Sequence, residues 1–248
     1  MATIKDVALK AGASVGTVSR YLNGYKIKEE NKFNIDAAIK ELDFTINQIA
    51  RGLKTNKTNT IGVLIPGLSN VFSLQVISGM EKRFHDYGYN ILVCNSSGDL
   101  QREKEKLRLL KDSCVDGIIL MPVSDTSEHL IDFGILIVQI DRLAKGINLD
   151  GVIADNVHGV YNAMESIIKG GHKRIGFIAG NNSIYTSRER VEGYLMALKD
   201  YAVDIDEALI IYSDFEKIGG EQAINKLMAL EEPPTVIFAS NYYTWRLV

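Results

Sequence analysis

The segment from residue 15 to residue 20 has side chains that could read the bases of DNA. Val18 and Leu22 lie four residues apart and would bury one face of a short helix. The opposite face would then present Val15, Gly16, Ser19 and Arg20. A small face with one arginine fits the major groove, where a guanidinium can bond to a guanine edge. The same pattern also fits an ordinary helical hairpin, because the local signature of a helix-turn-helix is loose.

A second group of residues could bind a small molecule. They stand at the ends of predicted strands, or in a helix next to a strand end: Phe72, Asp141, Asp155 and Arg190. Carboxylate and guanidinium groups can bond to hydroxyls, and an aromatic side chain can stack on a ring face. Structural interpretations compete with this one, since Asp141 could form a local ion pair with Arg142 and Arg190 could be a solvated helix residue.

The sequence has no recognisable catalytic or metal-binding constellation. GxGxxG, GxxxxGK[ST] and GxSxG are all absent. The four histidines are scattered, without a CxxC or HExxH partner: His85, His129, His158 and His172. We therefore expect no catalytic residues, no metal and no cofactor, and we interpret the later part of the chain as a binding domain rather than an enzyme.

Three short helices are predicted to position the first group, in a domain of residues 1–46. Apolar residues recur at helical spacing in the first and third helices: Ile4, Val7, Ala8 and Ala11, then Ile35, Ala38, Ile39 and Leu42. Gly12 can take a positive φ and end the first helix, and Ser14 can cap the second. The pattern predicts a small all-α bundle, which is marginal by itself.

Residues 47–60 are predicted to connect this bundle to the rest of the chain. A short, weak helix over residues 47–54 precedes the polar run TNKTNT. Leu53 stands there among Arg51, Lys54 and Lys57. It is either an incidental exposed leucine or an apolar wedge that enters a minor groove while the cations hold phosphates.

From residue 61 apolar runs alternate with amphipathic segments. Strands are predicted at residues 61–67, 90–96, 116–122, 135–142 and 151–156, with helices at 71–88, 101–113 and 127–134. A second set follows, with helices at 161–171, 187–201 and 219–230 and strands at 174–180, 209–214 and 235–240. This alternation predicts α/β lobes with parallel sheets, at residues 61–158 and 159–248, and a binding cleft at the carboxyl ends of the strands.

Charge and composition limit the class of protein. Residues 1–60 contain ten Lys/Arg and six Asp/Glu, a balance of +4, whereas the whole chain carries −3, so the remainder carries −7. A basic head on an acidic body suggests that only the head meets a polyanion. No signal peptide or long apolar run is present, so we expect a cytoplasmic protein without a membrane partner. Cys94 and Cys114 lie in apolar stretches, and we expect both to be buried free thiols.

The order of these parts resembles the lactose-repressor/galactose-repressor family of bacterial transcription regulators. The resemblance covers residues 3–241. Its most specific parts are TIKDVALKAGASVGTVSRYLNG, NQIARGLKTNKTNTIGVLIP, the run NILVCNSSGDLQREKEKLRLL with the later VDGIILMP, the pair Asp141-Arg142, GGHKRIGFIAG and RERVEGY. It implies a helix-turn-helix domain plus a two-lobed effector domain similar to periplasmic binding proteins. The partners it implies are operator DNA, a small effector and a second copy of the chain.

The resemblance also assigns roles to individual residues. Val15, Gly16 and Arg20 would face bases, Thr17 and Ser19 would hold phosphates, and residues 47–54 would form a hinge helix that orders on DNA. The DNA-contacting residues in that hinge would be Asn47, Ala50, Arg51, Leu53 and Lys54. Phe72, Asp141 and Arg190, with Asp155 as a weaker candidate, would line an effector cleft. A sugar suits these groups, and a nucleobase or another small metabolite also fits the family.

Several positions depart from the family pattern. Ile46, Val71 and Leu136 stand where prolines are common, and Gly16 stands where many relatives carry a larger side chain. The resemblance fades after FASN, and the chain ends at NYYTWRLV. We therefore expect an incomplete second lobe, lower stability and an impaired effector response.

Four functions can be compared. A repressor controlled by an effector accounts for both the head and the lobes. A solute-binding protein would need a signal peptide and no DNA-binding head, and a sugar-active enzyme would need a catalytic constellation. The fourth alternative is a truncated regulator that dimerises poorly and binds its operator weakly or not at all.

Overall fold

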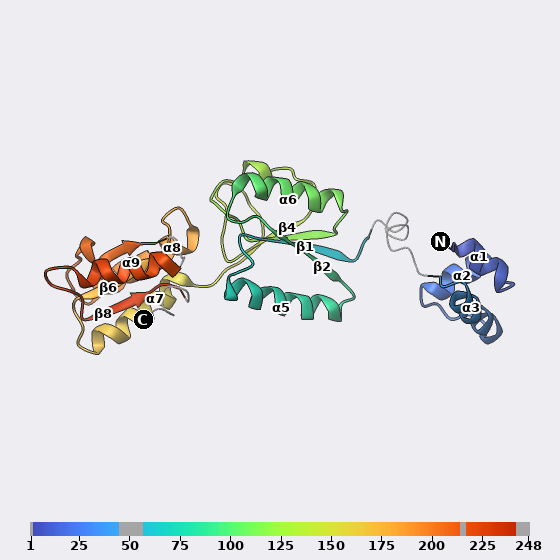
Figure 1. The fold of residues 1–248 in the computed structure, drawn as a ribbon, viewed down its shortest axis with the longest axis horizontal. Coiled ribbons are helices and arrows are strands. Elements are labelled where there is room, and N and C mark those ends of the chain that lie inside the picture. Colours follow the sequence, from blue (N-terminus) through green and yellow to red (C-terminus); the bar gives the residue numbers. More distant parts are fainter. Residues whose placement is uncertain (1, 45–56, 214–216, 242–248) are drawn as a thin grey trace. The chain divides into compact units, whose positions relative to one another are not determined.

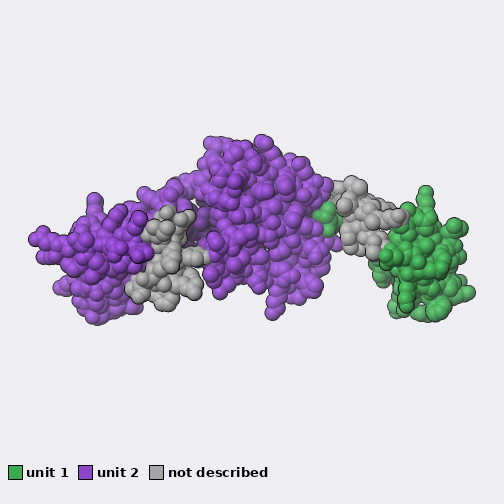
Figure 2. Space-filling model, viewed as in Figure 1, with its two compact units in different colours: residues 1–58 green, residues 59–248 purple. Residues whose placement is uncertain are grey.

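The computed structural model describes residues 2–44, 57–213 and 217–241 of the 248-residue chain. The chain divides into two compact units, residues 1–58 and residues 59–248, which are coloured separately in Figure 2. The first unit is all-α and the second is α/β. Both classes agree with the sequence prediction.

Three helices make up the described part of the first unit: α1 (Ile4–Lys10), α2 (Val15–Leu22) and α3 (Glu29–Glu41). Their shared core contains the predicted apolar positions, with Val7, Val18 and Ile35 fully buried. The helix starts are set by local chemistry. The side chain of Thr3 accepts from the backbone N–H of Asp6, whose carboxylate accepts from Thr3, and Ser14 caps α2 as expected.

The second unit begins with a five-stranded parallel sheet of order β2-β1-β3-β4-β5 (Figure 1). Its strands are β1 (Thr60–Ile65), β2 (Asn90–Asn95), β3 (Gly117–Leu120), β4 (Ile137–Ile140) and β5 (Gly151–Val152). α5 (Val71–Asp86) covers one face and α6 (Leu100–Asp112) covers the other. Alternate residues of β1 face opposite helices: Leu64 packs with Leu107 and Leu110 of α6, and Val63 and Ile65 pack beside Ile77 and Met80 of α5.

The later part of the second unit has a three-stranded parallel sheet of order β7-β6-β8. The strands are β6 (Ile175–Ala179), β7 (Ile210–Tyr212) and β8 (Val236–Ala239), and the helices are α7 (Asn156–Lys169), α8 (Tyr185–Asp200) and α9 (Lys217–Met228). Phe177 packs with Met164 and Tyr194 on one face, whereas Ile178 packs with residues of α9 on the other. The boundary expected at residues 158/159 falls in the first turn of α7.

Two sequence expectations were wrong. Residues 127–134 form only a short 3-10 helix, η1 (Glu128–Leu130), because Asp132 and Gly134 both take positive φ values, 51° and 80°. Cys114 is exposed rather than buried, while Cys94 is buried, and neither cysteine forms a disulfide. Cys114 lies just after the C-cap of α6 with φ 54°, so the chain turns there and leaves the apolar stretch.

A second short 3-10 helix, η2 (Glu207–Leu209), leads into β7. Within the described residues, no helix is both long and apolar enough to cross a lipid bilayer.

Candidate functional site

The second helix of the bundle presents an open face. Val18 is fully buried, whereas Val15 is 43% exposed and Gly16 and Arg20 are exposed. The residues predicted to face bases therefore lie on the accessible side of α2. This is the arrangement that a recognition helix requires, because base edges can be reached only by side chains that the fold does not use.

Gly16 is not required by the fold. A Cβ added there would meet only the Ser14 hydroxyl oxygen, at 3.7 Å, which is ordinary contact. The backbone of Gly16 is helical and has no positive φ. The missing side chain is therefore a feature of the outer surface and leaves room for whatever approaches α2.

Thr17 and Ser19 are half-buried beside this face. The Thr17 hydroxyl lies 2.9 Å from the hydroxyl of Ser14, which also accepts from the Thr17 backbone N–H at 3.0 Å. The carbonyl oxygen of Ser19 accepts from the Asn23 amide at 2.7 Å. These bonds fix the first and last turns of α2. The predicted contacts Asn47, Ala50, Arg51, Leu53 and Lys54 lie outside the described residues.

In the α/β unit, Asp141 follows β4 directly, at the carboxyl edge of the sheet. It has a φ of 65°, and its side chain is only 11% exposed. The guanidinium Nε of Arg142 lies 3.5 Å from a carboxylate oxygen of Asp141. Burial raises the pKa of Asp141, and the positive charges of Arg142 and Arg190 oppose that rise. Burial likewise lowers the pKa of Arg142, against the charge of Asp141.

Arg190 lies in the second turn of α8 and is not the solvated residue of the alternative interpretation. Its Nε donates to Asn156 at 2.9 Å, and a terminal nitrogen donates to the Ser240 carbonyl at 2.8 Å. Burial lowers the pKa of Arg190, while the charges of Asp141 and Glu189 oppose that effect. Arg190 of α8, in the second lobe, therefore interacts electrostatically with Asp141, which follows β4 in the first lobe.

The other two predicted residues have different settings. Asp155 is exposed and caps α7, where it accepts from the backbone N–H of His158 at 3.0 Å and pairs with the His158 ring. Phe72 is 46% exposed in the first turn of α5, the helix that follows the carboxyl end of β1 after a short loop. Phe72 and Asp141 therefore follow strands of one sheet at the same edge. Asp155 already has a complete structural role.

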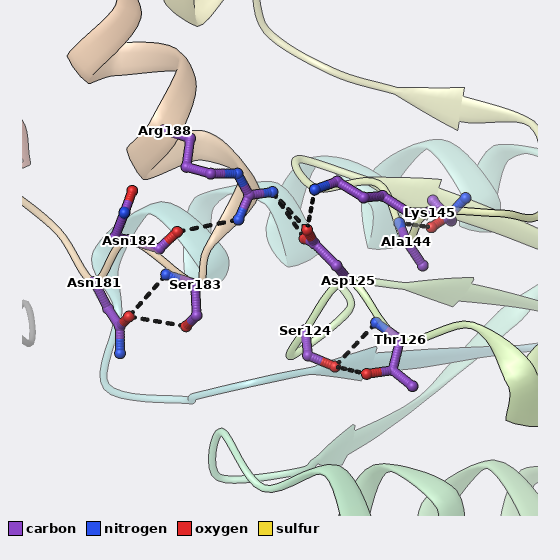
Figure 3. A network of polar contacts seen from close by, with 10 residues as sticks. Ser124, Asp125, Thr126, Ala144, Lys145, Asn181, Asn182, Ser183 and Arg188 are labelled. Carbon is purple, nitrogen blue, oxygen red and sulfur yellow. Dashed lines mark hydrogen bonds and ion pairs between the residues drawn. The ribbon is translucent and has the colours of Figure 1, made fainter.

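A small recess lies between residues of the two lobes. Its lining is Pro122, Val123, Ser124, Asp125, Arg142, Leu143, Ile184 and Tyr185. None of the four predicted residues lines it, although Arg142 is the neighbour of Asp141. Figure 3 shows Asp125 held between Lys145 and Arg188 beside it. In the described part of the chain, no group of three or more His, Cys, Asp or Glu residues could hold a metal ion.

Two family descriptions match this arrangement. Residues 3–47 match "Bacterial regulatory proteins, lacI family", and residues 58–244 match "Periplasmic binding proteins and sugar binding domain of LacI family". The chain belongs to the LacI family. It is a DNA-binding transcriptional regulator whose second domain is of the sugar-binding type.

Known LacI-family proteins are similar over most of the chain. The HTH-type transcriptional repressor PurR of Photobacterium profundum is 34% identical over 247 residues, which cover 97% of this chain and 74% of that protein. The HTH-type transcriptional regulator RegA of Clostridium saccharobutylicum is 37% identical over 238 residues, which cover 94% and 72%. A crystal structure of the Lac repressor dimer bound to operator and the anti-inducer ONPF has a TM-score of 0.86 at 21% identity, over 98% of this chain and 74% of that one.

Sequence reasoning missed several polar residues of this LacI-family domain. Asp125 lies in the loop after β3 and had a weaker form of the signal of Asp141, a carboxylate a few residues past a strand end. Glu103 had a different signal, because it is a charged residue on the buried stripe of α6 with Leu107 and Leu110. It is 1% exposed, and its carboxylate binds the His129 ring at 2.8 Å and the Val123 backbone N–H at 2.8 Å.

Proposed function

We propose that this regulator represses transcription by binding a palindromic operator as a homodimer, and that a small hydroxylated molecule of the sugar class controls it. One observation carries the proposal. A folded helix-turn-helix with an unused outer face on α2 occurs in the same chain as two largely buried charged groups of opposite sign, Asp141 and Arg190, which come from the two lobes and influence each other's pKa. A regulator needs both parts, whereas a solute-binding protein or an enzyme needs only the second.

The proposed DNA contacts are Val15, Gly16 and Arg20 at bases and Thr17 and Ser19 at phosphates. The hinge residues Asn47, Ala50, Arg51, Leu53 and Lys54 complete them as part of the proposal. Because this face of α2 is small, it can make few base contacts in one half-site. Specificity therefore requires a second copy of the chain at a second half-site. The protein would act in the bacterial cytoplasm, where the chromosome lies.

Selection from random DNA tests the operator part. We expect an enriched sequence with twofold symmetry and half-sites about 10 bp apart, or a multiple of that distance. Gel shifts should show the selected site bound in preference to unrelated DNA of equal length at the same salt concentration. Light scattering on the complex measures whether two chains bind. Enrichment without symmetry would contradict the dimer, and no enrichment at any salt concentration would contradict the repressor.

For the effector we propose that Asp141 and Arg190 bond to ligand hydroxyls while Phe72 stacks on the ring. The domain binds its ligand and leaves it unchanged. Burial of both charged groups supports this role, because water competes weakly for them and a ligand hydroxyl can replace their present partners. Asp155 is the weakest of the four, since it is exposed and already caps α7.

Thermal shifts with a panel of sugars and nucleobases test the effector part. A ligand that raises the melting temperature of the native chain should have less effect on Asp141→Asn and Arg190→Gln. Asp155→Ser is the matched control, because serine keeps the helix cap and removes only the carboxylate. If the ligand raised the melting temperature of Asp155→Ser as much as that of the native chain, the site would be limited to the other three residues. An undiminished shift in Asp141→Asn would contradict the proposed site.

A further inference from the structure

Asp125 and Arg188 join the two lobes of the α/β unit. Asp125 follows β3 of the five-stranded sheet, whereas Arg188 is in the first turn of α8, which packs beside the three-stranded sheet. One terminal nitrogen of Arg188 donates to both carboxylate oxygens of Asp125, at 2.9 and 2.7 Å (Figure 3). The side chains are 30% and 25% exposed, so water reaches this contact only partly.

Both partners are fixed by their own lobes. The other terminal nitrogen of Arg188 donates to the Asn182 carbonyl at 3.1 Å, and Asn181 braces the same loop by accepting from Ser183. On the opposite side, buried Glu103 accepts from the Val123 backbone N–H, two residues before Asp125. An ion pair between such fixed groups loses little side-chain entropy when it forms, in contrast to most surface pairs.

Lys145 is a second partner of the same carboxylate. Its ammonium lies 2.8 Å from Asp125, and its backbone N–H donates to the Asp125 carbonyl at 2.9 Å. Burial by itself would raise the pKa of Asp125, but hydrogen bonds from Lys145 and Arg188 outweigh it and hold that pKa below its ordinary value. Asp125 therefore stays ionised, with one cation from its own lobe and one from the other.

We propose that the Asp125–Arg188 pair is a latch that holds the two lobes together in the effector-free regulator. Lys145 keeps the carboxylate charged and oriented but does not cross between the lobes. Opening the lobes breaks the contact to Arg188 and leaves the contact to Lys145 intact. The latch thus sets how readily the effector domain opens, and its regulatory consequence rests on the proposed function of that domain.

Distance measurements between spin labels on the 248-residue chain test the latch. Labels at Gln101→Cys on α6 and Lys199→Cys on α8, both exposed positions, report the separation of the lobes in a Cys114→Ser background. Arg188→Gln should lower the ratio of closed to open molecules about fivefold, as expected for losing one partly buried ion pair. Arg188→Lys should recover most of the closed population.

Four further variants isolate the contact. Asp125→Asn and the double variant with Arg188→Gln should match Arg188→Gln alone, because all three lose the same interaction. Arg174→Gln is the matched control: Arg174 is also 30% exposed and pairs with Asp206 at 2.8 Å, but both residues lie in the second lobe. Lys145→Gln should leave the lobes closed.

The outcomes separate the two proposals. No change in Arg188→Gln, or equal opening in Arg174→Gln or Lys145→Gln, would overturn the latch. The distance is measured without effector or DNA, so it tests the latch even if the proposed effector or operator is wrong. Conversely, a latch that opens as expected would stand if no sugar shifted the melting temperature.

Discussion

At the scale of single residues, Arg20 and Gly193 differ in what the fold requires. The fold makes little use of the Arg20 side chain, whereas it requires the absence of a side chain at Gly193. Arg20 is exposed on α2, and no ion pair within the described residues involves it. Its charge therefore does little for folding and is available to a partner. Gly193 is buried in α8, where an added Cβ would lie 2.2 Å from the carbonyl oxygen of Val157 in α7. Its absent side chain lets the two helices approach.

Arg20→Ala should weaken binding to the selected operator by about 10- to 100-fold, because a bidentate contact to guanine contributes roughly 1–3 kcal/mol of discrimination. Non-specific DNA binding should weaken much less. Gel shifts at one salt concentration measure both. Lys40→Ala, which removes the same charge from α3, should reduce both kinds of binding equally. An Arg20→Ala variant with unchanged preference for the operator would contradict a base contact.

Gly193→Ala should destabilise the α/β unit by about 1–3 kcal/mol, because the methyl group forces α7 and α8 apart. Alanine's better helix propensity, about 1 kcal/mol, offsets only part of this. Urea unfolding measures the change. Gly159→Ala in α7, where nothing lies within 4 Å of the added Cβ, should be neutral or stabilising. Equal effects of the two substitutions would show that the close approach is not what requires glycine.

At the scale of secondary-structure elements, the helices of the first unit differ in their caps. α1 begins with a capping box and α2 with Ser14, whereas the N-cap of α3 is Lys28, whose side chain makes no capping bond. The backbone of Lys28 already has the extended conformation of an N-cap, with φ −63° and ψ 139°. The start of α3 is therefore correctly shaped but lacks a side-chain acceptor at its N-cap.

Lys28→Ser should stabilise α3 by about 1 kcal/mol, because the serine oxygen can accept from the first turn. Hydrogen exchange of the α3 amides in the intact chain should slow about fivefold as a result. Lys26→Ser removes the same charge two residues before the cap and serves as the control. Equal slowing in both variants would indicate a charge effect rather than a cap.

At the scale of the α/β unit as a whole, carboxylates determine the response to acid. Hydrogen bonds from the backbone of His158, the backbone of Ala208 and the hydroxyl of Tyr201 are the largest causes of lowered pKa values at Asp155, Asp206 and Glu165, respectively. Asp141 differs, because burial raises its pKa. A lowered folded-state pKa stabilises the protein above the unfolded pKa, and this contribution is lost as pH falls through the folded value. The raised pKa of Asp141 acts in the opposite direction.

Stability should therefore be nearly constant above about pH 5 and decline below about pH 4, since four lowered carboxylates, Asp125 included, outweigh one raised carboxylate. Urea midpoints between pH 7 and pH 3 measure this. Asp206→Asn keeps an amide acceptor for the cap but loses its charge beside Arg174, so its acid decline should be shallower. A decline as steep as that of the native chain would remove Asp206 from the explanation.

The sequence predicted the elements well because their causes are local. Helical spacing located Val7, Val18 and Ile35 in the first core, and Ser14 was recognisable as a cap from its position alone. Each of these features depends on residues a few positions apart. The two errors also arose from local patterns. The apolar surroundings of Cys114, and those of the segment beginning at Ser127, carried no sign of the positive φ values nearby.

By itself the sequence determined most of the helices and strands that the structure describes, the class of each unit and the strand ends where a site could form. Only the tertiary structure decided which side chains meet at those ends. Asp125 and Arg188 lie 63 positions apart, and Glu103 and His129 lie 26 apart. No periodicity encodes such pairs, because they depend on how whole strands and helices pack. Burial then decides their strength, since a charge removed from water interacts strongly with the few groups that packing places beside it.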